Sequence, residues 1–201
     1  MEQVENRILL RGTLADLPVF SHENHGKQFY RFALKVPRLS DNVDILPVVA
    51  PRFLVENIPA RQNTGLRVAG QIRSHNLRSD GRRHLSVFVF ASQLEPEDAE
   101  AINQAELEGI LCREPTYRRT PLGREICDVM LAVPRAFRRT DYLPCILWGS
   151  TAQEGACCHT GDRIRIAGRL QSRTYTKVTE DGPVLKTTYE ISALSADFPK
   201  E

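Results

Sequence analysis

An internal repeat constrains this 201-residue chain more than any other feature, because a shift of 97 residues lays its second half onto its first. Between positions 6 and 47 the shift gives 13 identities in 42 positions, among them Gly12 with Gly109 and Asp44 with Asp141. Average composition would give on the order of 3. Since the unit is far longer than the roughly 20–50 residues of a solenoid repeat, each copy should be a complete small domain.

The repeat predicts where the domains begin and end. With one residue of slip, residues 66–74 align with 164–172, so the similarity extends through both copies. We therefore expect a first domain at 1–96, a linker at 97–103 and a second domain at 104–201.

Within each copy apolar residues recur with a period of two, which is typical of strands. Five strands are expected per copy, at about 5–14, 28–36, 43–49, 65–75 and 83–91, and again at 104–113, 124–133, 141–148, 162–175 and 184–193. The Asp-Gly pairs at 80–81 and 181–182 predict hairpin turns, and 51–58 and 150–158 are long enough for a short helix. The expected fold class is all-β: two tandem OB-fold five-stranded barrels, each with a short helix between strands three and four.

The composition excludes a charge-driven tail, because 27 Lys and Arg nearly balance 25 Asp and Glu. The 41% of hydrophobic residues is typical of a folded protein. No apolar run approaches the roughly 20 residues of a membrane span, and the N-terminus has no signal-peptide pattern. We expect a cytoplasmic protein that does not associate with membranes.

The five cysteines do not predict a metal site or a disulfide framework, because no pair forms a C-x-x-C motif. Three consecutive ligands at Cys157, Cys158 and His159 cannot all face one tetrahedral ion. We expect no metal, no cofactor, and thiols that act as small hydrophobic side chains. An OB-containing hydrolase is poorly supported, since no nucleophile–base pair, Gly-rich phosphate loop or metal–carboxylate set is apparent.

The second copy carries the residues that an oligonucleotide-binding OB face requires, namely aromatic rings for bases and cations for phosphates. Tyr142 and Trp148 lie six positions apart on the third strand, so both should point to one face. Phe137 precedes that strand and Tyr175 ends the fourth. The first copy has Ile45 and Pro51 at the positions of Tyr142 and Trp148, so we expect it to supply backbone or subunit contacts more than stacking.

Arginines gather beside these aromatics, and the segment 113–139 has a local net charge of +4. A planar guanidinium can both fork onto a phosphate and stack on a base. The predicted cationic residues are Arg118, Arg119, Arg124, Arg135, Arg138, Arg139, Arg169, Arg173 and Lys177. Ordinary structural roles compete with this interpretation, because a strand Trp is often a core residue and an arginine run can be a solvated face.

The second copy resembles the bacterial single-stranded DNA-binding protein family in its motifs at 106–109, 131–135, 142–149 and 161–175. More narrowly, the segments 20–22, 70–76, 117–126 and 172–175 look like those of the two-domain members of clostridia-type bacteria. The resemblance implies non-enzymatic, sequence-tolerant binding of single-stranded DNA in replication, recombination or repair. It also implies that Tyr142, Trp148, Tyr175 and, more loosely, Phe137 stack on bases.

Family members commonly assemble four OB barrels, so the resemblance implies a homodimer. Many also end in a Gly/Pro-rich linker and an acidic tip that recruits replication proteins. Here 195–201 directly follow the last expected strand, which favours an auxiliary or mobile-element role. The alternative function is a primosome-like protein-interaction adaptor built on OB folds, with secondary DNA affinity.

Overall fold

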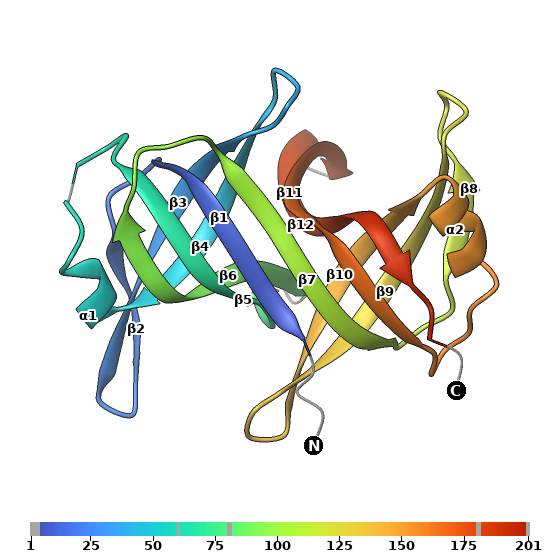
Figure 1. The fold of residues 1–201 in the computed structure, drawn as a ribbon, viewed down its shortest axis with the longest axis horizontal. Helices are drawn as coiled ribbons and strands as arrows, with labels where there is room; N and C mark the ends of the chain where they lie inside the picture. Colours follow the sequence, from blue (N-terminus) through green and yellow to red (C-terminus); the bar gives the residue numbers. More distant parts are fainter. Residues whose placement is uncertain (1–4, 60, 80–81, 180–181, 200–201) are drawn as a thin grey trace.

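A computed structural model describes residues 5–59, 61–79, 82–179 and 182–199, and its two halves lie beside each other (Figure 1). The first half contains β1 (Asn6–Leu14), β2 (Val19–Asn24), β3 (Lys27–Pro37), β4 (Val43–Pro51), α1 (Arg52–Val55), β5 (Gly65–Ser79) and β6 (Arg82–Pro96). The second contains β7 (Ile102–Leu111), β8 (Thr116–Arg119), β9 (Glu125–Arg135), β10 (Arg139–Trp148), α2 (Ser150–Gly155), β11 (Arg163–Thr179) and β12 (Gly182–Asp197). Each half therefore repeats the same order of elements.

Each half closes into a barrel. β1 pairs with both β5 and β3, and β7 pairs in the same way with β11 and β9. The fourth and last strands of each half, β4 with β6 and β10 with β12, run parallel. Alternate residues of these strands are buried, as the period of two predicts, and fill the two barrel interiors.

Two short strands, β2 and β8, were not among the ten predicted. Every residue of β8 is exposed and five of the six residues of β2 are exposed, so neither has the alternation that marks a half-buried strand. Each forms a hairpin with the strand that follows it. They belong to the loop between the first and second predicted strands, and they extend the sheet at its two ends.

Two glycines lie at β-bulges, at equivalent positions of the two barrels. The register of β5 against β6 shifts between Ala69 and Gly70, and that of β11 against β12 shifts between Ala167 and Gly168. A Cβ added at Gly70 would lie 2.1 Å from the Phe90 carbonyl oxygen. A bulge bends its strand, and here only a residue without a side chain allows the backbones to approach.

The two barrels are joined edge to edge. β1 pairs antiparallel with β7 over six residue pairs, from Asn6↔Leu107 to Arg11↔Ile102, so one twelve-stranded sheet runs through the molecule. The segment 97–101 lies between β6 and β7. The predicted division into 1–96, 97–103 and 104–201 stays a prediction.

Side chains bind backbone groups at equivalent positions of the two copies, both within each copy and across the junction. The Asn6 amide group bonds both the carbonyl oxygen and the N–H of Ile72 within its own copy, at 2.8 and 2.9 Å. Asn103 does the same with Leu170. Across the junction, Ser172 donates from its N–H to Asp44 at 2.7 Å, while Ser74 donates from its N–H to Asp141 at 2.8 Å. The two copies of the repeat therefore pair with each other within one chain in a nearly two-fold arrangement.

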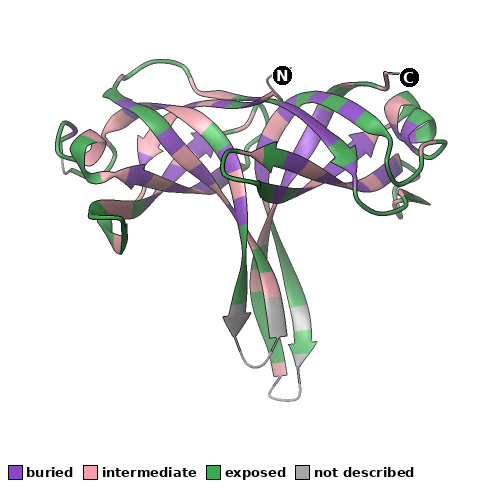
Figure 2. Cartoon of the chain, turned by 90° about the horizontal axis from the view of Figure 1, so that it is seen from below, coloured by how far each residue is buried: buried purple, intermediate pink, exposed green. Residues whose placement is uncertain are grey.

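Two long hairpins, β5–β6 and β11–β12, project beside each other from one side of the molecule (Figure 2). Their outer parts are mainly exposed. The predicted Asp-Gly turns fall at 80–81 and 181–182, and residues 80, 81 and 181 lie outside the described part. Within the described ranges, none of the helices has the length and apolar character that crossing a membrane requires.

Candidate nucleic-acid interface

The outer face of β10 carries both predicted aromatics. Asp141, Leu143, Cys145 and Leu147 are buried, while Tyr142 is 44% exposed and Trp148 is partly exposed. The even spacing therefore puts both rings on the side that faces away from the barrel interior.

Trp148 lies in a pocket of about 500 Å³. Its indole Nε1 donates to the Ser192 hydroxyl at 3.0 Å, which fixes the ring against β12. The pocket is lined by Arg38, Arg124, Trp148, Arg169, Gln171, Ser192, Ala193 and Leu194. It brings together three predicted residues, Trp148, Arg124 and Arg169, and adds Arg38 from the first copy. The Arg169 Nε is buried and has no hydrogen-bond partner among the described residues.

Phe137 and Tyr175 lie apart from this pocket. Phe137 is 94% exposed in the turn between β9 and β10 and has a φ of 61°, and Arg138 has a φ of 55°. A bulky residue rarely adopts this left-handed conformation, so the turn holds the ring out at a conformational cost. Tyr175 is 44% exposed on β11, opposite Lys186 of β12.

Four of the predicted arginines already pair with carboxylates. Arg118 contacts Asp128 at 2.6 Å, Arg119 contacts Glu125 at 2.9 Å, Arg135 contacts Asp141 at 3.4 Å and Arg173 contacts Glu190 at 3.9 Å. The hydrogen bond that Arg118 donates to Asp128 raises the pKa of Arg118, and the one that Arg119 donates to Glu125 raises the pKa of Arg119. These pairs offset part of the local charge that the sequence count of +4 suggested.

Three predicted arginines are not paired with a carboxylate among the described residues. Arg124, Arg138 and Arg139 are exposed and form no ion pair with any described residue. Arg138 follows Phe137 in the β9–β10 turn, Arg139 is the first residue of β10, and Arg124 lines the Trp148 pocket. The Lys177 side chain lies outside the described part of the chain.

The first barrel has aromatic rings that a comparison at a constant shift of 97 did not find. Phe29 on β3 lies 5.8 Å from Phe90 on β6, measured between ring centroids, and His22 stacks on Phe29 at 4.9 Å. Phe88 contacts His75 at 5.3 Å. The signal that could have found them is the strand register, since β6 and β12 align with a different shift from the rest of the repeat.

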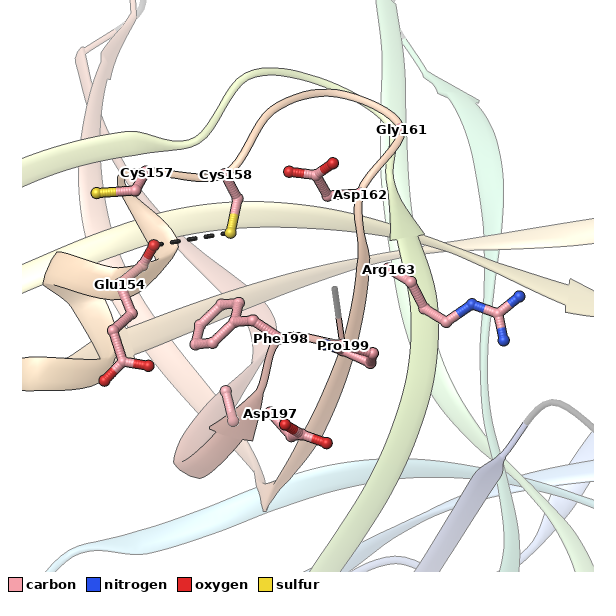
Figure 3. A pocket seen from close by; sticks show the side chains of 10 residues that line it. Glu154, Cys157, Cys158, Gly161, Asp162, Arg163, Asp197, Phe198 and Pro199 are labelled. Carbon is pink, nitrogen blue, oxygen red and sulfur yellow. Dashed lines mark hydrogen bonds between the residues drawn. The ribbon is translucent and has the colours of Figure 1, made fainter. Parts of the chain in front are cut away.

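All five cysteines are free. Cys127 and Cys145 are buried, which raises the pKa of both thiols, that of Cys127 to about 11. Cys157 and Cys158 line a second pocket, of about 630 Å³, between α2 and the C-terminal segment around Phe198, and their thiols point in different directions (Figure 3). The prediction of small hydrophobic thiols therefore fits the two buried cysteines best.

The second pocket is distinct from the predicted interface. Among the described residues no group of three His, Cys, Asp or Glu side chains is placed to hold a metal ion. Cys158 donates to the Glu154 carbonyl oxygen at 3.6 Å, a contact internal to the helix end (Figure 3). None of the predicted interface residues lines this pocket.

The fold defines the chain as a tandem OB-fold protein. The wild-type single-stranded DNA binding protein from Thermus aquaticus matches it with a TM-score of 0.80 over 99% of this chain and 95% of that one, at 22% identity. The likeness covers both copies, so the predicted fold class of two tandem OB barrels is confirmed.

Sequence comparison then gives the family. The model of the Single-strand binding protein family matches residues 102–199. A Listeria innocua protein, single-stranded DNA-binding protein 2, is 32% identical over 104 residues, which are 48% of this chain and 64% of that protein. Single-stranded DNA-binding protein 1 of Lactococcus lactis is 36% identical over 81 residues, 37% of this chain and 54% of that protein. The second copy is therefore similar to the single-strand binding protein family, over a match that spans just under half of the chain.

The chain spans only about half to two thirds of the length of these curated relatives. The match confirms the predicted resemblance to this family over the second copy. The narrower resemblance to clostridia-type members stays a prediction.

Proposed function

We propose that this chain is a non-enzymatic, sequence-tolerant single-stranded DNA-binding protein that acts in replication, recombination or repair. The observation that carries the proposal is the Trp148 pocket, where an indole ring lies among three arginines drawn from both copies, on the outer face of an OB barrel. Its support from sequence is the family match over 102–199.

The proposed mechanism divides the work between rings and cations. Bases stack on Tyr142, Trp148 and Tyr175, with Phe137 as an exposed ring at the edge of the site, because every base offers a π-face and stacking therefore tolerates any sequence. Arg124, Arg138, Arg139 and Arg169 neutralise phosphates. Arg118, Arg119, Arg135 and Arg173 can join only by sharing or leaving their carboxylates, so we assign them a smaller part. Lys177 keeps its proposed role from the sequence.

Trp148 is the only tryptophan, so its fluorescence reports on the proposed site. We expect oligo(dT) to quench it, duplex DNA of equal length to do so much less, and binding to weaken steeply as salt rises because phosphate contacts release counterions. The measurement is a titration with both ligands at two salt concentrations. A constant signal together with no gel shift at low salt would show that the proposal is wrong.

We further infer that two chains associate and so bring four OB barrels together. The support is a set of exposed apolar side chains on the two projecting hairpins: Leu77, Leu85, Val178, Val184 and Leu185. Exposed apolar clusters of this kind mark interaction sites. Sedimentation equilibrium should give a mass of twice 22.7 kDa, and Leu185→Asp, at a residue 72% exposed, should lower it toward one chain. A wild-type mass of one chain at micromolar concentration would contradict this inference.

A second candidate function is the protein-interaction adaptor. It is favoured by Leu39 and Ile45, which are 107% and 40% exposed on the first barrel and suit a protein surface better than a base. An adaptor would bind a defined replication protein equally well after nuclease treatment, and its oligo(dT) affinity would be weak at low salt.

A further inference from the structure

Strand register shows that the first barrel has an aromatic ring where the second has Ser192. Ser192 lies opposite Arg169 of β11 and Ile146 of β10, and Phe90 lies opposite Gln71 of β5 and Val49 of β4. These positions are equivalent in the two barrels, on both neighbouring strands. In the second barrel Trp148 reaches from β10 to Ser192, whereas in the first the equivalent of Trp148 is Pro51. The first barrel therefore carries its aromatic ring on β6, the strand next to β4, and on the same outer face.

Phe90 belongs to an open aromatic pocket and not to the barrel core. Its neighbours Val89 and Ala91 are fully buried, while Phe90 itself is partly exposed on the opposite side of β6. The pocket has a volume of about 720 Å³ and is lined by Gly26, Lys27, Gln28, Phe29, Pro51, Arg52, Phe53, Glu56 and Phe90. Phe53, at 63% exposure, stands at its rim. Three phenylalanine rings, Lys27 and the Arg52–Glu56 ion pair thus line one depression.

Arg73 lies directly on the Phe90 ring, with its guanidinium carbon 3.6 Å from the ring centroid. It forms no ion pair with the described carboxylates, and its only described side-chain hydrogen bond goes to the Gln71 oxygen at 3.1 Å. Its Nε is buried without a partner. A cation stacked on an aromatic ring can equally stack on a base or bind a phosphate.

The position of Arg73 also links the two barrels. Its neighbour Ser74 accepts a hydrogen bond from the Tyr142 N–H at 2.8 Å. The strand that carries Tyr142, β10, therefore contacts the first barrel one residue away from Arg73. Burial, and then the nearby Arg135 and Arg139, lower the pKa of Arg73 to about 10, although Asp141 opposes this. Arg73 therefore stays charged at neutral pH, and three guanidinium groups gather at the junction with one buried carboxylate. This excess of positive charge favours a bound anion.

We propose that the first barrel has a base-stacking site of its own, formed by Phe90, Phe29 and Phe53, for nucleotides of single-stranded DNA. Arg73 binds the phosphate at the junction, so one strand passes from Tyr142 of the second barrel into the Phe90 pocket of the first. The inference rests on the proposed function and replaces the expectation that the first copy contributes little stacking.

The test compares two Phe→Ala variants of the full chain in oligo(dT) titrations. Phe90→Ala should weaken binding of long oligo(dT) by roughly 5- to 150-fold, the effect of losing a stacked base. The quenching of Trp148 by short oligomers should be unchanged. Phe20→Ala is the matched control, because Phe20 is 54% exposed, packs only edge-on against Tyr30 at 6.1 Å and lies outside the pocket. Far-UV circular dichroism verifies that both variants fold.

A second variant keeps the test independent of affinity. In the double variant Trp148→Phe, Phe90→Trp the single indole reports on the first barrel, and oligo(dT) should quench it. If this signal stays constant at saturation and Phe90→Ala and Arg73→Gln bind long oligo(dT) like the wild type, the first-barrel site does not exist. The proposed function would still stand in that case, because its own test is the quenching of Trp148 in the unmodified chain.

Discussion

Replacing Tyr142 by alanine weakens binding of single-stranded DNA by about 1–3 kcal/mol, and replacing Tyr175 does the same, if each ring stacks on a base. At 25 °C this corresponds to a loss of roughly 5- to 150-fold in affinity for each variant. Both rings are 44% exposed, so their removal leaves no cavity in the core and the loss should appear in binding and not in folding. The measurement is the dissociation constant for oligo(dT), from Trp148 fluorescence at fixed salt.

The double variant Tyr142→Ala, Tyr175→Ala should lose approximately the sum of the two effects, since the rings lie on different strands, β10 and β11. Tyr117→Ala is the matched control: Tyr117 is 40% exposed on β8 and outside the predicted set. An equal loss for all three single variants would mean that any exposed tyrosine contributes, and the assignment of Tyr142 and Tyr175 would be wrong. An unchanged affinity for the double variant would also contradict it.

The fold could be predicted because the period of two reflects which side chains are buried, and the repeat shows that this pattern occurs twice. Ten long strands and both helices lie where the alternation and its interruptions indicated. The strands β2 and β8 were missed because nearly all of their residues are exposed. Their pairing is decided by the neighbouring strands β3 and β9, which a local pattern does not contain.

The candidate site was only partly predictable, and the reason is pairing in three dimensions. Residue types alone located Trp148 and its arginines, but the contacts of Arg118 with Asp128 and Arg119 with Glu125 depend on how β8 folds onto β9. The ring at Phe90 was missed for a related reason. A constant shift compared Trp148 with Pro51 on β4, while the ring that faces the equivalent space comes from β6.

The reciprocal contacts between the copies have the largest expected effect on stability, and Asp44 is their centre. Its carboxylate is fully buried and accepts two hydrogen bonds from Arg38, at 2.6 and 2.8 Å. It also accepts from the N–H and the hydroxyl of Ser172, at 2.7 and 3.0 Å. Asp141, at the same place in the second copy, accepts from the Ser74 N–H and lies 3.4 Å from Arg135, with one carboxylate oxygen left unpaired.

Asp44→Ala should therefore lower the free energy of unfolding by roughly 3–5 kcal/mol, because it leaves the Arg38 charge and the Ser172 N–H without their partner. Asp141→Ala should cost less, about 1–3 kcal/mol, since mainly one buried N–H loses its acceptor. Asp41→Ala, at an exposed residue, is the control and should cost less than about 0.5 kcal/mol.

Urea unfolding, followed both by Trp148 fluorescence and by far-UV circular dichroism, measures all three values. Trp148 lies on β10 of the second barrel, so a loss of stability caused by Asp44→Ala in the first copy should shift the fluorescence transition and the circular dichroism transition together if the barrels unfold as one unit. Equal midpoints for Asp44→Ala and Asp41→Ala would show that the Asp44 carboxylate does not hold the two copies together. A larger loss for Asp141→Ala than for Asp44→Ala would contradict the asymmetry that their hydrogen bonds predict.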